Sequence, residues 1–154
     1  MFIAINFELV SGASVDNEFE IISFDNALIN AKVSDYNILK VSSILPANCR
    51  YLPVIQNCKG SILHMAYASY TQKGTGIISS AVAVGIPAES HNIGVIMEYS
   101  CFKGQRHCIN TVETLVQSAM KNRDILIKEI MSIGCEAKLS KELYSTTFAG
   151  IAMW

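Results

Sequence analysis

Apolar and polar side chains alternate at the start of the chain, which predicts a β-strand over residues 2–10. Ser11 and Gly12 are expected to end this strand. Residues 61–69 alternate in the same way, and residues 38–41 are apolar and β-branched, so both segments are also expected to be strands. The apolar face of the first strand carries Ile3, Ile5, Phe7 and Leu9.

Residues 76–85 form a continuous run of small and apolar residues, residues 93–100 contain a shorter apolar run, and residues 144–153 are rich in small and apolar residues. A run like that of residues 76–85 is typical of a strand that buries both of its faces. We expect all three to be strands, and the small residues of the first to allow another backbone or a ligand to approach closely. The last is suited to a central or interface position.

A helical period predicts a first helix from Ser14 to about residue 31. Asn17 and Glu20 have the spacing of a capping box, although Ser14 or Asp16 would also serve as the N-cap. One stripe of this helix carries Ile21, Ile22, Leu28 and Ile29.

A second helix is predicted from Asn110 to about residue 133. Asn110 and Glu113 again have capping-box spacing, and Gly134 suits the position after the helix C-terminus. We expect this helix to be core scaffold without a chemical role. Its apolar stripe comprises Val112, Leu115, Val116, Ala119, Met120, Ile127, Ile130 and Met131.

The order of these elements predicts an α+β fold, that is, a layered α/β arrangement, in a single domain over residues 1–154. Hydrophobic residues make up 51% of the chain and charged residues 16%. No apolar run approaches the ~18 residues of a membrane span, so a subunit interface is the better explanation for the apolar excess. The net charge of −1 gives no indication of binding to nucleic acid or to a membrane.

The cysteines are odd in number and none are spaced as Cys-x-x-Cys. This pattern favours free thiols in a reducing cytoplasm. No signal peptide is recognisable, and the histidines show no metal-ligand spacing, so no metal is expected. The five cysteines are Cys49, Cys58, Cys101, Cys108 and Cys135.

Ser42 and Ser43 stand side by side between the apolar strand at residues 38–41 and Pro46. The Ser43 hydroxyl can attack the preceding carbonyl, and the resulting ester can eliminate. Hydrolysis then leaves a pyruvoyl group at position 43, with release of ammonia. The alternative is an ordinary Ser-Ser turn that bonds to its own backbone.

Two carboxylates stand at conspicuous places. Asp25 falls on the apolar stripe of the first helix, either as an edge residue that reaches water or as an anion for a substrate cation such as a guanidinium. Glu98 follows an apolar run, either as an exposed strand end or, if buried, as an acid whose raised pKa keeps a proton near neutral pH.

Residues 37–46 resemble the self-cleavage site of the pyruvoyl-dependent arginine decarboxylases. Residues 9–12, 24–28, 74–87 and 94–98 resemble further segments of that family in the same order. The similarity is looser beyond about residue 100.

The resemblance implies a four-layer α-β-β-α sandwich, of the type found in the pyruvoyl-dependent histidine and arginine decarboxylases. It implies assembly into trimers, or hexamers made of paired trimers, with active sites between neighbouring protomers. The expected reaction converts L-arginine to agmatine and CO2. The expected cofactor is a covalent pyruvoyl group made from Ser43, which withdraws electrons as pyridoxal phosphate does elsewhere, so neither that cofactor nor a metal is expected.

The resemblance also implies residue roles. Self-cleavage would leave a β chain of residues 1–42 and an α chain of residues 43–154. Ser42 supplies the carbonyl that Ser43 attacks, Asn37 orients the scissile carbonyl or amide, and Glu98 donates the proton during catalysis.

For substrate binding, the resemblance assigns the guanidinium to Asp25, the aliphatic stem to Leu28 and the reacting centre to the backbone at Ile44. Two other interpretations stay open. One is a pyruvoyl enzyme for another amino acid, such as histidine or a longer basic substrate. The other is an uncleaved, non-enzymatic trimeric protein of the same fold. A serine hydrolase is disfavoured because no Gly-x-Ser-x-Gly motif is present.

Overall fold

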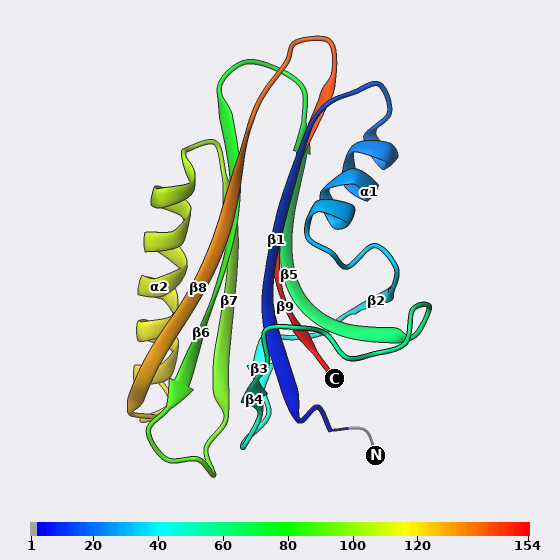
Figure 1. Cartoon of the computed structure of the whole chain (residues 1–154). Helices are drawn as coiled ribbons and strands as arrows, with labels where there is room; N and C mark the ends of the chain where they lie inside the picture. Colours follow the sequence, from blue (N-terminus) through cyan, green and yellow to red (C-terminus); the bar gives the residue numbers. More distant parts are fainter. Residues whose placement is uncertain (1–2) are drawn as a thin grey trace.

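The computed structural model describes residues 3–154 as two β-sheets packed face to face, with one helix on the outer side of each (Figure 1). This arrangement confirms the four-layer α-β-β-α sandwich. No helix formed by the described residues is both long and apolar enough to cross a membrane. The elements are β1 (Asn6–Asn17), α1 (Glu20–Asn30), β2 (Asn37–Lys40), β3 (Ile44–Leu45), β4 (Arg50–Tyr51), β5 (Ile62–Gln72), β6 (Ile77–Pro87), β7 (Gly94–Cys101), α2 (Gln105–Lys121), β8 (Ile127–Lys138) and β9 (Tyr144–Met153).

One sheet has the strand order β2-β5-β9-β1-β4 and the other β3-β7-β6-β8. Neighbouring strands are antiparallel except for the parallel pairs β1–β4 and β2–β5. The first 42 residues therefore supply β1, α1 and β2, and β1 lies inside the first sheet between β9 and β4. The chain first passes from one sheet to the other between β2 and β3, and it crosses again between β3 and β4, β5 and β6, and β8 and β9.

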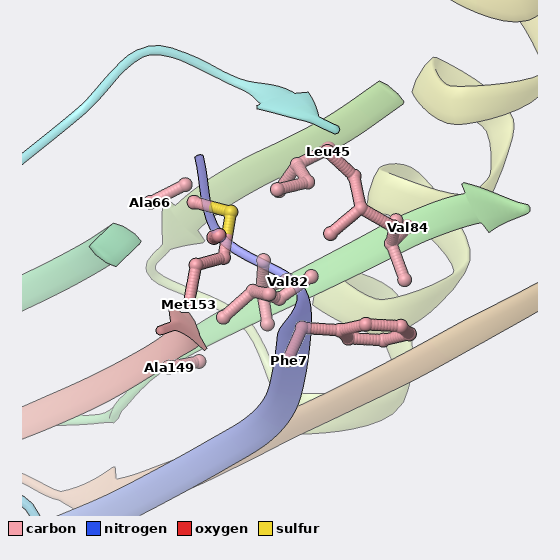
Figure 2. Close-up of a cluster of buried hydrophobic side chains, with 10 residues drawn as sticks. Phe7, Leu45, Ala66, Val82, Val84, Ala149 and Met153 are labelled. Carbon is pink, nitrogen blue, oxygen red and sulfur yellow. The ribbon is translucent and has the colours of Figure 1, made fainter. Parts of the chain in front are cut away.

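Apolar side chains fill three layers: between the sheets, under α1 and under α2. Figure 2 shows the layer between the sheets, where Phe7, Val82 and Met153 meet. On β6, Val82 and Val84 face this layer, whereas Ala81 and Ala83 face α2. Burial on both faces explains the continuous apolar run that predicted β6.

The boundary between the first strand and the first helix was predicted wrongly. Strand β1 continues through Gly12 to Asn17, and α1 begins only at Glu20, after Phe19. Gly12 continues the strand because α1 lies directly against it, and a Cβ there would collide with the backbone of Ala27. Ser14 does not cap the helix but donates to the Ser23 carbonyl at 2.6 Å. The capping box with Asn17 is therefore absent, since the N-cap of α1 has no side-chain hydrogen bond.

The second helix was also predicted too late in the chain. Helix α2 runs from Gln105 to Lys121, and its N-cap Gly104 makes no side-chain capping bond, so the predicted capping box at Asn110 does not form. The stretch from Ile127 to Lys138 is strand β8, paired antiparallel with β6. Gly134 lies inside β8, against the Ser80 carbonyl, rather than after the helix. Four residues of the predicted stripe lie on α2 and are buried against the sheet, namely Val112, Val116, Ala119 and Met120.

The apolar stripe of α1 faces outward in the single chain. Ile21 is 71% exposed and Ile29 is 51% exposed, whereas the side buried against the sheet carries Ser23 and Ala27. Asp25 lies on the exposed side, as expected of an edge position that reaches water. The apolar residues around it form a surface that another protein chain would bury favourably.

Candidate active site

The two adjacent serines lie where the chain crosses from one sheet to the other. Strand β2 ends at Lys40 in the first sheet, and β3 begins at Ile44 in the second. The Val41 N–H donates to the Met65 carbonyl at 3.1 Å, and the Ile96 N–H donates to the Ser43 carbonyl at 2.9 Å. The peptide bond between the serines is therefore held from both sheets.

The chain bends sharply at this crossing. The Ile44 N–H donates to the Ser42 carbonyl at 2.9 Å, which closes a three-residue γ-turn centred on Ser43. Leu45 is only 2% exposed because its side chain enters the core between the sheets, as Figure 2 shows. Burial of Leu45 and pairing of β3 with β7 fix the position of the turn.

The Ser43 hydroxyl donates to the Glu98 carboxylate, with Oγ 3.1 Å from Oε2 and 3.4 Å from Oε1. Glu98 lies on β7 opposite Val82 of β6. Alternation along β7 places Glu98 on the same face as Ile96, toward the other sheet. Burial raises the pKa of Glu98, and the hydrogen bond from Ser43 and the charge of Lys40 partly offset this rise.

Lys40 brings a positive charge to the same junction. Its Nζ lies 4.5 Å from the centre of the Tyr67 ring on β5, a cation–π distance. Neither residue was singled out from the sequence. A basic residue three positions before Ser43, at the end of an apolar strand, was the available signal, but the partner ring is remote in sequence.

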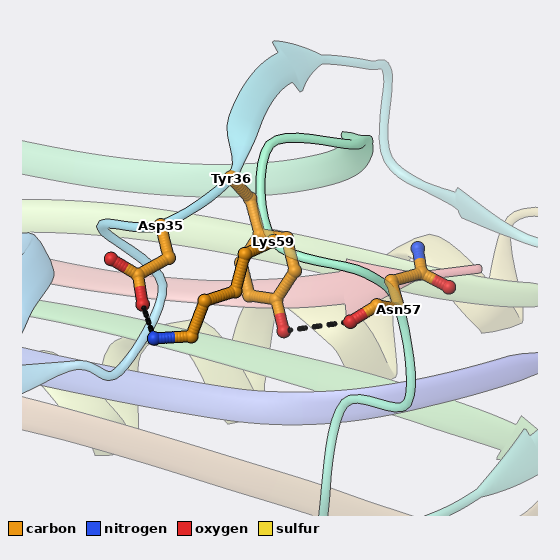
Figure 3. Close-up of polar contacts among 4 residues, drawn as sticks. All are labelled: Asp35, Tyr36, Asn57 and Lys59. Atoms are coloured by element: carbon orange, nitrogen blue, oxygen red, sulfur yellow. Dashed lines mark hydrogen bonds and ion pairs between the residues drawn. The ribbon is translucent and has the colours of Figure 1, made fainter.

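Asn37 lies at the opposite end of β2 from the two serines. Its Nδ2 donates to the Gly60 carbonyl at 2.7 Å. Just before it, Asp35 pairs with Lys59 at 2.6 Å and the Tyr36 hydroxyl donates to a carbonyl of the same loop, as Figure 3 shows. A strand advances about 3.3 Å per residue, so Asn37 lies roughly 15 Å from Ser42 of its own chain.

Asp25 and Leu28 lie on α1, outside the first sheet. Leu28 is half-buried against the apolar layer under α1. Asp25 lines a surface depression of about 570 Å³ together with Lys32 and Asp35. Glu98 faces the interior of the sandwich from the second sheet, so the single chain does not bring Asp25 and Glu98 into one pocket.

The single chain thus forms two separate groups from the predicted site residues. Ser42, Ser43, Ile44 and Glu98 meet at the crossing between the sheets. Asp25, Leu28 and Asn37 lie elsewhere on the first sheet and its helix. Within residues 3–154, no group of His, Cys, Asp and Glu side chains has the arrangement of a metal site.

The resemblance assigned the backbone at Ile44 to the reacting centre, but its donation to the Ser42 carbonyl and the Ile96 donor were not predicted. The Ile96 N–H reaches the Ser43 carbonyl because β3 pairs with β7, which places Ile44 opposite Val95. Side-chain patterns do not report backbone register across two distant strands, so no local signal for the Ile96 donor was present.

A family model and several curated relatives match this chain over most of its length. The family model for pyruvoyl-dependent arginine decarboxylase matches residues 6–154. A relative from Methanococcus aeolicus named pyruvoyl-dependent arginine decarboxylase is 32% identical over 147 residues, covering 95% of this chain and 87% of the relative. A relative with the same name from Methanocaldococcus jannaschii is 30% identical, with the same shares covered. One from Methanothermobacter thermautotrophicus is 32% identical over 133 residues, covering 85% of each chain. The chain therefore belongs to the pyruvoyl-dependent arginine decarboxylase family.

Proposed function

We propose that this protein cuts itself between Ser42 and Ser43 and then decarboxylates L-arginine to agmatine and CO2. The observation that carries the proposal is the Ser43 hydroxyl, which lies 3.1 Å from the Glu98 carboxylate at the bend of the chain. This contact puts the nucleophile proposed for the cut beside the acid proposed for the decarboxylation, so one point of the chain serves both proposed reactions. The products of the cut are residues 1–42 and 43–154.

The surroundings of Ser43 suit a covalent pyruvoyl group at that position. The Ile96 N–H already holds the Ser43 carbonyl at 2.9 Å, and Glu98 lies beside the side chain. A pyruvoyl group supplies a ketone that condenses with the substrate amine and withdraws the electrons left by CO2. Ile96 would keep the carbonyl in place, and Ile44 would continue to define the backbone next to it.

Glu98 is proposed as the acid that returns a proton to the substrate α-carbon. Burial raises the pKa of its carboxyl, despite the opposing effects of Ser43 and Lys40. A raised pKa keeps the carboxyl protonated closer to neutral pH, where it can act as a general acid. Its place against Ser43 puts that proton where the reaction occurs.

Lys40 tunes this acid, which leads to a measurable pH effect. Removing its charge in Lys40→Met is expected to raise the pKa of Glu98 further, because Lys40 opposes the rise caused by burial. Since the protonated acid is the active form, the fall of kcat at high pH should move to higher pH. Lys40→Arg keeps the charge and serves as the control. A shift to lower pH in Lys40→Met would contradict this role for Lys40.

The substrate side chain is proposed to bind a second copy of the chain. Asp25 is exposed on α1 and suits a guanidinium, because a carboxylate can accept two parallel hydrogen bonds from it. Leu28 would pack on the aliphatic stem. Both lie apart from Glu98 in one chain, so a neighbouring protomer would complete the site, in a homotrimer or a hexamer. The exposed apolar residues available for such an interface include Ile21, Ile22, Ile29, Leu39, Ile44 and Ile62.

Asn37 is proposed to assist self-cleavage in the same way, from a neighbouring copy. Within its own chain its amide is committed to Gly60 and lies roughly 15 Å from Ser42 along the strand. A junction from a second protomer would have to approach it. Asn37 therefore belongs with Asp25 and Leu28 to the part of the site that assembly supplies.

Sites shared between protomers can be tested by mixing inactive variants. Asp25→Asn and Glu98→Gln are each expected to lose activity. When they are co-expressed, about a quarter of sites should combine an intact Asp25 from one copy with an intact Glu98 from another. Recovered agmatine formation measures this. A mixture of Asp25→Asn with Asp25→Ala is the control and should stay inactive, and failure of the first mixture to recover would mean that each copy builds its own site.

Intact mass under denaturing conditions tests the proposed function directly. Two fragments divided after Ser42 are expected, and the longer should be lighter than a serine-started chain by the mass of one ammonia. Agmatine release is then assayed with arginine first and with histidine and longer basic amino acids for comparison. A chain that stays whole at 16.9 kDa would support the non-enzymatic alternative.

A further inference from the structure

We propose that the backbone N–H of Ile44 is the oxyanion donor for self-cleavage: it stabilises the negative charge that develops on the Ser42 carbonyl oxygen. The inference rests on the proposed cut between Ser42 and Ser43 and adds a specific group to it. No side chain is required for this task, because the turn itself presents the donor to the carbonyl under attack.

The geometry of the turn carries the proposal. Before the attack, the Ile44 nitrogen lies 2.9 Å from the Ser42 carbonyl oxygen. This oxygen stays bonded to the same carbon as the charge develops, so the donor is aimed at the region where the oxyanion forms. The donor and the acceptor are two residues apart. The turn that the hydrogen bond closes therefore contains the scissile peptide bond and the backbone of Ser43, whose hydroxyl is the nucleophile. The carbonyl is thus polarised before the reaction begins.

The donor is held rigidly. Ile44 pairs with Val95 and Leu45 with Gly94 on β7, and the Leu45 side chain is buried between the sheets. On the other side, the Ile96 N–H fixes the Ser43 carbonyl. A donor that is positioned in advance needs no reorganisation when the charge appears, and this is the main source of its stabilising effect.

The chemical step balances within the chain. The Ser43 Oγ attacks the Ser42 carbonyl carbon, a C–O bond forms, and the carbonyl electron pair moves onto the oxygen that faces the Ile44 N–H. Collapse of this tetrahedral centre breaks the C–N bond between Ser42 and Ser43. The departing nitrogen takes up the proton that Oγ has lost, so the ester is an isomer of the starting chain.

The other donors near the junction are committed to different acceptors. The Ile96 N–H bonds the Ser43 carbonyl, which is one peptide unit beyond the attacked carbonyl. The Asn37 amide bonds the Gly60 carbonyl at the far end of β2. In the structure of residues 3–154, the Ser42 carbonyl accepts its backbone hydrogen bond from Ile44.

The test removes this one N–H and keeps the side chain. Ile44 is replaced by its α-hydroxy acid analogue, which turns the linkage between residues 43 and 44 into an ester. The scissile amide between Ser42 and Ser43 is untouched. Cleavage, followed by intact mass over time, is expected to slow by about 10²–10³-fold. The masses also distinguish a cut after Ser42 from hydrolysis of the introduced ester.

The same exchange at Ala88 is the matched control, because it removes an N–H that donates to the Leu126 carbonyl, away from the junction. It should cleave at the parent rate. Thermal unfolding of each uncut chain confirms that it is folded. Equal rates for the parent and the Ile44 ester, or equal slowing of the Ile44 and Ala88 esters, would overturn the proposal. A parent that never cleaves would overturn the proposed function as well.

Discussion

Ser43→Ala is expected to leave one uncut chain without decarboxylase activity. The substitution removes the only atom that attacks the Ser42 carbonyl in the proposed reaction, and it also removes the atoms from which the pyruvoyl group is made. The hydroxyl donates to Glu98 and is half-buried, so its loss leaves a small gap beside a carboxylate that retains the charge of Lys40 nearby. The fold should survive, because Leu45 and the β3–β7 pairing remain.

Ser42→Ala provides the matched control. It deletes a hydroxyl one residue away, on an exposed side chain, and leaves the attacked carbonyl in place. This variant should still cleave and form product. Intact mass and agmatine release measure both variants. If Ser43→Ala still gave fragments divided after residue 42, Ser43 would be ruled out as the nucleophile. If Ser42→Ala lost cleavage while Ser43→Ala kept it, the reacting serine would be Ser42.

Glu98→Gln is expected to separate the two reactions. The glutamine amide oxygen can still accept the hydrogen bond from Ser43, and the Ser42 carbonyl keeps its donor, so self-cleavage should go to completion. The amide cannot donate a proton as an acid does, so kcat should fall by about 10²–10⁴-fold. KM should change little, because the proposed contacts to the guanidinium lie elsewhere.

The direction in which activity changes with pH tests the proposed role of Glu98 as an acid. Burial raises the pKa of Glu98 above its ordinary value. The protonated form is the acid, so activity should be retained below this raised pKa and lost as the pH rises through it. Glu98→Asp, which keeps an acid on a shorter side chain, should retain part of the activity and a similar limb. Full turnover in a cleaved Glu98→Gln protein would show that another group supplies the proton.

The sequence patterns predicted an element correctly where they favoured a single type of secondary structure. The segments of β6 and β9 bury both faces, and their strands were predicted correctly. The stretch from Ile127 to Ile133 was different, because its apolar residues satisfy a helical stripe as well as a strand. Pairing with β6 decides for the strand, and that contact is remote in sequence.

The residues of the candidate site also differ in whether the sequence alone could identify them. Ser42, Ser43 and Glu98 could be found from residue type, position and family resemblance. The cation over Tyr67 and the Ile96 backbone donor could not, because they depend on which strands become neighbours. The stripe of α1 was identified, but helical periodicity does not say whether the same chain covers an apolar face, and here Ile21 and Ile29 are exposed.

The passage of the first 42 residues through the middle of a sheet has a consequence for the order of events in the life of the protein. Before the cut, β1 reaches its place between β9 and β4 by folding of one molecule, at a rate independent of concentration. After the proposed cut, the same strand would belong to a separate polypeptide, and recovery from denaturant would become a second-order encounter. The mature protein should therefore show hysteresis: it unfolds at one denaturant concentration and regains its structure only at a lower one, or at higher protein concentration. The proposed order of events is therefore folding first, with β1 placed between β9 and β4, and the cut second.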